Sequence, residues 1–291
     1  MEKENQTYDE NYYKKLNRQN GMRNKWDEKY AQNKLMDWEL IDPENMKNYI
    51  NSISINKQKI NRILEYGCGR GFRVLSWVLL DPDINREDVY IKCIDISNEA
   101  IKDAKRNLEQ LKNNKFPDDF VALTNVEINN KKIVSNQFVS MVNDGDVPEI
   151  KCKIEFVNKD LFSGFPAEEK YDLVIDWMCF HELAVEYRRD YVKITDEVCE
   201  NYYMLTVFCK DTCDLPIEEF KQVADGIPKY MFSCQEIRQY FGIIFDQISA
   251  FDVYYPSIRD KVHSDGMVFP KKSYFMVKKN RKLQEVDTGT V

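Results

Sequence analysis

The chain has 291 residues, a net charge of −7 and a hydrophobic fraction of 43%. This length suits one large α/β domain with embellishments, and the apolar content excludes wholesale disorder. The acidic balance gives no basic footprint and argues against a general nucleic-acid binder, and the longest apolar runs are too short to span a membrane.

The first 55 residues are predicted to form a helical segment ahead of the main domain. Residues 1–25 are charged and read as a frayed start followed by a surface helix. Trp26, Tyr30 and Trp38 then lie on an amphipathic stretch, where aromatic residues either cap a core or shape a ligand site. Asp42 followed by Pro43 predicts the start of a further helix, which runs to about residue 53.

Residues 63–72 read Ile-Leu-Glu-Tyr-Gly-Cys-Gly-Arg-Gly-Phe and predict a strand, a tight turn and a helix. Glycines at 67, 69 and 71 allow a left-handed backbone and close approach to a ligand, and the following helix offers free N–H groups. A dinucleotide fingerprint would need a third glycine at position 72, which is Phe. The alternative is a turn that serves packing alone.

The acid-x-Gly-x-Gly-x-Gly spacing, with the acid at Glu65, resembles the first motif of class I S-adenosylmethionine (SAM) methyltransferases. This resemblance implies that the turn, with Cys68 inside it, holds the methionine end of the cofactor, and that Glu65 lies near its ammonium group. Residues 90–95 predict the next strand, which ends in Asp95. There a carboxylate can bind both ribose hydroxyls, with Ile96 against the adenine, although Asp95 and Ser97 could instead cap the helix over 98–111.

Residues 116–150 do not belong to a minimal βαβ unit and are predicted to be an insertion. Alternation around Asn129 and Asn130 indicates a β-hairpin, and a plain surface loop is the alternative. The third strand, over 152–157, leads to Asp160 and Leu161, where the resemblance implies adenine contacts. Turn capping is the alternative for Asp160.

A buried strand over 173–175 opens into Asp176-Trp177-Met-Cys-Phe180-His181-Glu-Leu. This stretch resembles the fourth motif of the same enzymes, which implies a cofactor contact for Asp176 and Trp177 and an acceptor contact for Phe180 and His181. We expect a helix over 186–200, a strand over 202–209, a loop and short helix over 211–227, a helix from Ser233 to Phe241 and strands over 245–255 and 273–278.

The pattern Trp26-Asp-x-x-Tyr30 followed by Trp38 resembles the N-terminal lid of thiopurine, thiol/halide and tellurite-type methyltransferases. The resemblance implies a Rossmann-like sheet of seven strands, mostly parallel with one antiparallel strand, with helices on both faces. The expected organisation is a helical lid over 1–55, a SAM-dependent methyltransferase domain over 56–278 and a flexible tail over 279–291. The eight cysteines are scattered, which suggests buried free thiols, a cytoplasmic protein and no metal site.

The expected function is methyl transfer from SAM to a small-molecule acceptor, such as a thiol or another soft nucleophile, by in-line displacement. His181 is the candidate base, with Asp176 beside it, although an anchoring hydrogen bond from His181 is the alternative. Two other functions remain open. The insertion could dock a protein or RNA substrate, or the chain could be an inactive SAM-binding partner protein. A monomer is the default expectation.

Overall fold

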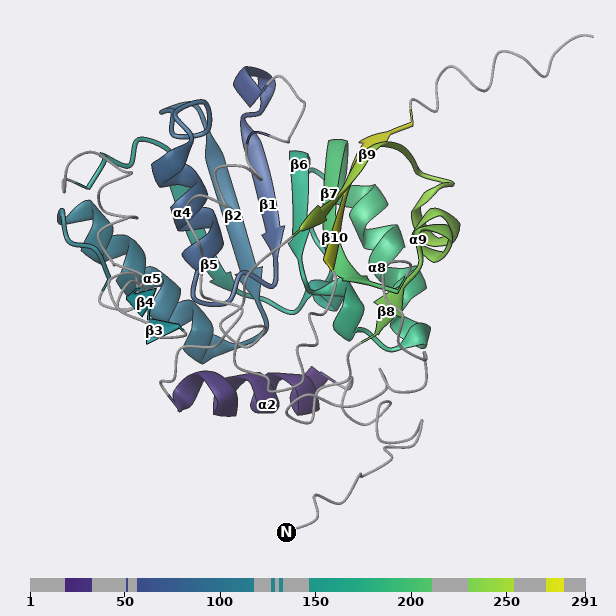
Figure 1. Ribbon diagram of the computed structural model, residues 1–291, viewed down its shortest axis with the longest axis horizontal. Helices are drawn as coiled ribbons and strands as arrows, with labels where there is room; N and C mark the ends of the chain where they lie inside the picture. Colours follow the sequence, from purple (N-terminus) through teal and green to yellow (C-terminus); the bar gives the residue numbers. More distant parts are fainter. Residues whose placement is uncertain are drawn as a thin grey trace, which may run out of the picture.

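The computed structural model describes residues 19–32, 51, 57–117, 127–128, 131–132, 147–210, 230–253 and 271–279. Helices cover both faces of a central sheet (Figure 1). The strands of that sheet are β1 (Arg62–Tyr66), β2 (Tyr90–Asp95), β5 (Lys153–Asn158), β6 (Tyr171–Trp177), β7 (Cys199–Cys209), β8 (Met231–Phe232), β9 (Phe245–Val253) and β10 (Lys271–Lys278). The helices are α2 (Gln19–Ala31), α4 (Phe72–Leu80), α5 (Asn98–Lys112), α8 (Val185–Val198) and α9 (Cys234–Phe241), with short 3-10 turns η2 (Lys57–Lys59), η3 (Leu161–Ser163) and η4 (Phe180–Glu182).

The strand order is β5-β2-β1-β6-β7-β10-β9, and β10 runs antiparallel to both of its neighbours, β7 and β9. This arrangement confirms the predicted α/β sheet, mostly parallel with one antiparallel strand. The order reverses between β1 and β6, so loops from the two halves of the sheet meet at its carboxyl edge, where doubly wound folds bind ligands. The short strand β8 was not predicted and pairs with Phe208 and Cys209 at the end of β7.

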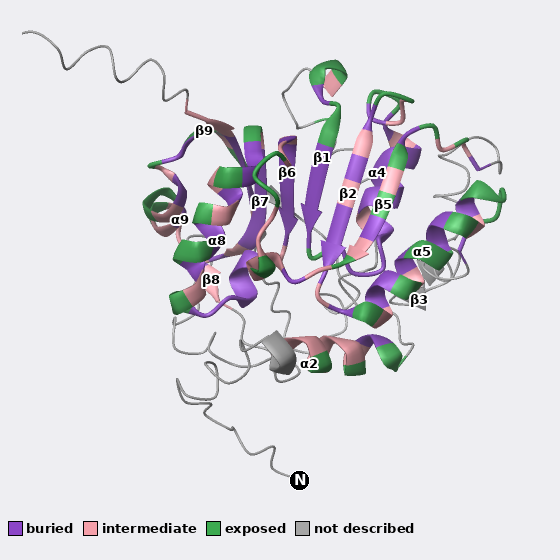
Figure 2. Ribbon diagram, turned by 180° about the vertical axis from the view of Figure 1, so that it is seen from behind, coloured by how far each residue is buried: buried purple, intermediate pink, exposed green. Residues whose placement is uncertain are grey.

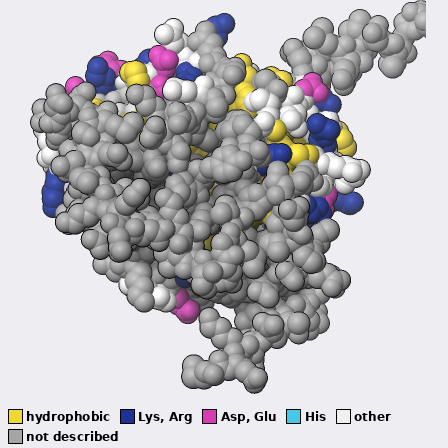
Figure 3. Space-filling view, in the orientation of Figure 1, with side chains coloured by type: hydrophobic (Ala, Val, Ile, Leu, Met, Phe, Trp, Pro, Cys, Tyr) yellow, Lys and Arg dark blue, Asp and Glu magenta, His cyan; other side chains and the backbone are white. Residues whose placement is uncertain are grey.

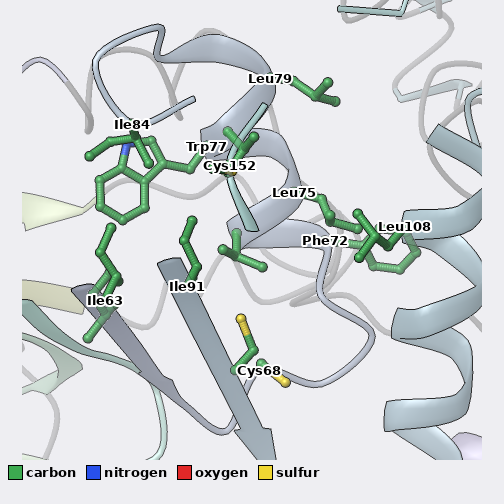
Figure 4. Close-up of a cluster of buried hydrophobic side chains, with 14 of the residues drawn as sticks. Ile63, Cys68, Phe72, Leu75, Trp77, Leu79, Ile84, Ile91, Leu108 and Cys152 are labelled. Carbon is green, nitrogen blue, oxygen red and sulfur yellow. The ribbon is translucent and has the colours of Figure 1, made fainter. Parts of the chain in front are cut away.

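Side-chain alternation along the strands divides the core into two clusters. Ile63 of β1 belongs to a cluster on one face that also holds side chains of α4 and α5, drawn in part in Figure 4. Leu64 and Tyr66 pack against α8 and α9 on the other face. Both faces are therefore covered, and β1 is buried along most of its length (Figure 2).

The predicted hairpin is confirmed by the antiparallel pair β3 (Glu127–Ile128) and β4 (Lys131–Lys132). The capping box that starts α9 is also confirmed, with Ser233 and Glu236 bonded reciprocally. Several predicted features lie outside the described residues: Trp38, nearly all of the helix over 42–53, the loop over 211–227 and most of the tail.

The cysteines of the described segments are all free thiols. No helix in the part of the chain that the structure describes is both long enough and apolar enough to cross a membrane. On the face shown in Figure 3, the described charged side chains are of both signs and lie interspersed.

Candidate functional site

The glycine turn follows β1 and delivers the chain into α4. Gly67, Gly69 and Gly71 have φ values of 62°, 54° and 78°, a region that residues with a side chain seldom adopt. A Cβ atom at Gly71 would lie 2.7 Å from the ring of Phe156. Glycine is therefore required at 71 both for its backbone conformation and for space.

Two hydrogen bonds join the glycine turn to the end of β2. The amide of Cys68 donates to the carbonyl of Ile94 at 3.1 Å, and the amide of Gly69 donates to Oδ2 of Asp95 at 2.8 Å. The other carboxylate oxygen of Asp95 accepts from the amide of Ser97 at 2.8 Å. Each carboxylate oxygen can accept two hydrogen bonds, so this bonding leaves room for a ligand.

Burial sets the electrostatics of Asp95. It raises the pKa of this carboxyl to about 6, while the bonds from Ser97 and Gly69 act in the opposite direction. Ser97 caps α5 by accepting from the amide of Ala100 at 3.1 Å. The capping alternative is thus present in the structure, carried by the Ser97 hydroxyl, and it leaves Asp95 available at the edge of the sheet.

Glu65 is a buried carboxyl at the end of β1, 2% exposed. Burial raises its pKa to about 7, partly offset by a hydrogen bond from Cys93 and by the charge of Arg73. Its Oε2 atom has no hydrogen-bond partner among the described residues. An unpaired acceptor in a buried position beside a glycine turn is costly unless a donor from a ligand satisfies it.

The adenine side of the expected site lies at the ends of β2 and β5. Ile96 and Leu161 are both half-buried, so each keeps apolar surface for contact. Asn158 fixes this corner by donating from Nδ2 to the carbonyl of Ile96 at 2.8 Å. Asp160 caps η3 through the amide of Phe162 at 2.9 Å, which is the turn-capping alternative for this residue.

Asp176, at the end of β6, is fully buried and surrounded by donors. Its oxygens accept from the amides of Cys179 at 2.6 Å and Phe180 at 2.9 Å, and also from the hydroxyl of Tyr191, which contacts that of Tyr203. Burial raises its pKa to about 7, and these three donors lower it. This bonding suits a residue that shapes the loop after β6, and it leaves the carboxylate little capacity to act on a substrate.

The aromatic residues at the end of β6 and directly after it lie in the core and not at an open surface. The ring of Trp177 packs edge-on against Trp77, 6.2 Å between centroids, and is 3% exposed. Phe180 is 0% exposed and packs against rings of α8 and α9, including Tyr191 and Phe241. Its ring is enclosed by these aromatic neighbours, and contact of Phe180 with an acceptor stays a prediction.

His181 is also enclosed, at 1% exposed. Its ring packs edge-on against Phe208 with 4.7 Å between centroids, and its Nε2 lies 3.7 Å from Oε1 of Glu182. Its backbone carbonyl accepts from the amide of Tyr230 at 2.9 Å. These contacts enclose the ring between the loop and β7, and the choice between base and anchoring hydrogen bond stays a prediction.

Met178 holds a left-handed backbone, φ 76°, which is uncommon for a residue with a side chain. Its amide donates to the carbonyl of Thr206 at 3.1 Å and so pins the loop to β7. Such strain costs about 1–3 kcal/mol and persists where the surroundings enforce it, often at functional sites. Nothing in the residue pattern marks Met178, because methionine carries no preference for this conformation.

Helix α2 lies across the carboxyl edge of the sheet (Figure 1). Oδ1 of Asp27 accepts from the hydroxyl of Ser97 at 2.7 Å and from the amide of Glu99 at 3.2 Å. Tyr30 is buried, and its hydroxyl lies 2.7 Å from where a Cβ of Gly69 would be. The turn that is expected to hold the cofactor and the helix expected to cover it are thus in contact.

Arg70 anchors the same helix to the glycine turn. Its Nη2 donates to the backbone carbonyl of Tyr30 at 3.1 Å, and its Nε pairs with Asp103 of α5 at 2.9 Å. Trp26 packs beside Tyr30, with 5.9 Å between ring centroids. The sequence pointed to Trp26 and Tyr30, but the anchoring roles of Asp27 and Arg70 follow from the tertiary structure alone.

Comparison with known proteins adds the likeness of the fold. No protein-family model matches the sequence, and no curated protein matches it. A SAM-dependent methyltransferase from Anabaena variabilis superposes with a TM-score of 0.56 at 13% identity, covering 90% of this chain and 96% of that one.

Two further solved structures are similar. One is a protein assigned as a methyltransferase from Haloferax volcanii, solved with the Trm112 methyltransferase activator. It superposes with a TM-score of 0.53 at 12% identity, covering 89% of this chain and 97% of that one. TehB from Haemophilus influenzae superposes with a TM-score of 0.47 at 15% sequence identity, covering 81% of this chain and 62% of that one. This TM-score is too low to support an argument. The first two likenesses show that the chain has the fold of these methyltransferases.

Proposed function

We propose that the protein is a SAM-dependent methyltransferase that acts on a small-molecule acceptor. The observation that carries the proposal is the glycine turn itself. Three glycines with positive φ are bonded through Gly69 to a carboxylate, Asp95, at the switch point of a doubly wound sheet. The shared fold with two proteins described as methyltransferases supports the same reading.

The residues present fit the cofactor at each of its ends. The unpartnered Oε2 of Glu65 suits the ammonium of the methionine moiety, and Asp95 retains capacity for the ribose hydroxyls. Ile96 and Leu161 offer half-buried apolar surface to the adenine, and the remaining oxygen of Asp160 suits its amino group. When bound, SAM supplies a methyl group already activated on sulfonium.

The chain's own task is then to position and desolvate the acceptor. We infer that α2 acts as the lid, because Tyr30 covers Gly69 and Asp27 holds the helix to α5. Asp176 and His181 fit positioning roles, since both are enclosed by the loop that they support. A thiol acceptor suits such a site, because a free thiol has a pKa of about 8.5 and needs little help from a base.

Calorimetry tests the cofactor, with SAM, S-adenosylhomocysteine (SAH) and NAD titrated separately into the protein. We expect SAM and SAH to bind at micromolar concentration and NAD not to bind. Tight NAD binding without SAH binding would refute the proposal. Transfer of labelled methyl to a panel of small thiols tests the acceptor class, and transfer only to protein or RNA would move the function to a macromolecular substrate.

A further inference from the structure

Two buried arginines of the described structure differ in how their charge is compensated. Arg70 is paired with Asp103. Arg188, on α8, is 6% exposed and has no carboxylate partner among the described residues. Its Nε donates to the carbonyl of Leu183 at 3.0 Å, and its Nη1 to the hydroxyl of Tyr240 at a long 3.4 Å. Its Nη2 has no hydrogen-bond partner in the part of the chain that the structure describes.

Aromatic rings surround this guanidinium. Its Cζ lies 4.3 Å from the ring centroid of Tyr230 and 4.7 Å from that of Phe232, and Tyr240 and Phe180 follow at 5.9 and 6.0 Å. Ring faces attract a cation, but they do not accept the in-plane N–H bonds of the guanidinium. A buried charge whose donors remain unpaired is unfavourable, which indicates that an anionic partner completes the site.

The location of Arg188 is next to the loop that the reaction would use. Leu183 and Phe180, its neighbours, belong to the stretch after β6, and Tyr230 is bonded to the carbonyl of His181. The short strand β8 brings Phe232 to the same place, beside the end of β7. This is the side of the carboxyl edge away from Asp95, where an acceptor rather than the ribose would lie.

We propose that Arg188 binds a carboxylate on the methyl acceptor, an inference that rests on the proposed function. One guanidinium without a second cation matches a planar monoanion better than a phosphate dianion, and its fork can bond both carboxylate oxygens. The half-buried rings of Tyr230 and Tyr240 would pack against an aromatic or apolar body of the acceptor. Tyr230 is half-buried and nearest to the guanidinium, so its ring is the group that an entering carboxylate displaces.

Thermal unfolding with small probes tests this assignment. Wild-type protein, with and without SAH, is mixed with sodium benzoate, with benzamide or with inorganic phosphate. We expect benzoate to raise Tm and the other two probes not to. Arg188→Met should weaken benzoate binding roughly 10- to 100-fold, the loss expected for a charge-assisted bond. Arg189→Met is the matched control, because it removes an exposed charge from the same helix and should leave the benzoate effect intact.

A second variant guards against misfolding of Arg188→Met. Arg188→Lys retains the charge without the fork, so it should fold and bind benzoate less tightly than wild type. Equal responses to benzoate and benzamide, stronger stabilisation by phosphate, or an undiminished response in Arg188→Lys would each overturn the assignment. SAH binding is measured separately, so failure of the cofactor proposal and failure of the carboxylate site give different results.

Discussion

The amide of Gly69 and the carboxylate of Asp95 are joined by a 2.8 Å hydrogen bond, which makes the glycine turn and the end of β2 one unit. Asp95 also receives the amide of Ser97, whose hydroxyl bonds Asp27 of α2. One continuous path of hydrogen bonds therefore runs from the turn through the strand end to the helix above it. Any ligand that contacts Asp95 is coupled through this path to the position of α2.

Asp95→Asn tests the centre of that path. The side-chain NH2 of the new Asn would face the backbone N–H of either Gly69 or Ser97, so one hydrogen bond is lost. We therefore expect the free energy of unfolding to fall by about 1–3 kcal/mol and SAH affinity to fall roughly 10- to 100-fold. Calorimetry and urea unfolding measure the two effects. Asp88→Asn, at an exposed carboxylate, is the control. Unchanged SAH affinity in Asp95→Asn would remove this residue from the cofactor site.

Gly71→Ala should destabilise the protein more than Gly164→Ala. Both glycines have positive φ, 78° and 75°, but their ψ values differ. The backbone cost of a side chain is about 1–2 kcal/mol at 71, where ψ is 5°, and about 1–3 kcal/mol at 164, where ψ is 174°. Only at 71 would the new Cβ meet a ring, at 2.7 Å, while at 164 it meets nothing within 4 Å. Overpacking adds about 1–3 kcal/mol, measurable by urea unfolding. Equal losses would show that the turn is less closely packed than described.

Glu65→Gln should change how stability depends on pH. The folded pKa of Glu65 is raised from 4.5 to about 7, so the folded state holds this proton more tightly than the unfolded state. Below about pH 4.5 the carboxyl is protonated in both states, and its burial does not lower the free energy of unfolding. As pH rises to about 7, the free energy of unfolding falls by up to about 3 kcal/mol. The variant should be more stable than wild type at pH 8, with a flatter profile in urea unfolding.

The same carboxyl links cofactor binding to pH. An ammonium bound at Oε2 favours ionised Glu65, so SAM binding near pH 6.5 should release protons. Calorimetry in buffers of different ionisation enthalpy counts them. Proton release that is identical in wild type and Glu65→Gln would contradict this role.

His181→Ala should leave SAH affinity nearly unchanged and lower Tm, because the ring packs on Phe208 inside the loop. With a positioning role, we expect methyl transfer to fall less than roughly 100-fold. A larger loss at unchanged SAH affinity, together with loss of a pH dependence of the rate, would instead identify His181 as a base.

Asp27→Ala should loosen α2, since it removes the acceptor for both Ser97 and Glu99. Loss of two such bonds corresponds to about 1–3 kcal/mol of docking free energy. Hydrogen exchange over residues 19–31 measures it, with Glu28→Ala as the control at an exposed position of the same helix. Unaltered exchange would mean that other contacts hold the helix in place.

The sequence predicts the sheet well because local patterns determine its parts. The glycines at 67, 69 and 71 and the capping box at Ser233 are interpretable from a few residues each. The position of Asp95 follows from the rule that parallel strands end at one edge. The same rule places Asp176 near the site but does not predict its bond with Tyr191, fifteen residues later. The hydroxyl of Tyr191 donates to the Asp176 carboxylate and occupies an acceptor position that a ligand could otherwise use.

Features built from distant residues were beyond the sequence. The enclosure of Phe180 depends on rings of α8 and α9, which lie outside the stretch that contains it and do not follow from its local pattern. The sequence places Arg188 only within a predicted helix, because its buried environment is made by Tyr230, Phe232 and Tyr240, which lie more than 40 residues later in the chain.

The place of β10 between β7 and β9 has a consequence for the order of assembly. β9 is made before β10, yet it reaches the sheet only through pairing with β10. During synthesis, β7 therefore keeps an open edge, and β9 waits without a partner strand, until residues 271–278 leave the ribosome. A chain that stops before residue 271 should lose both strands from the sheet and expose β7 to pairing with other chains.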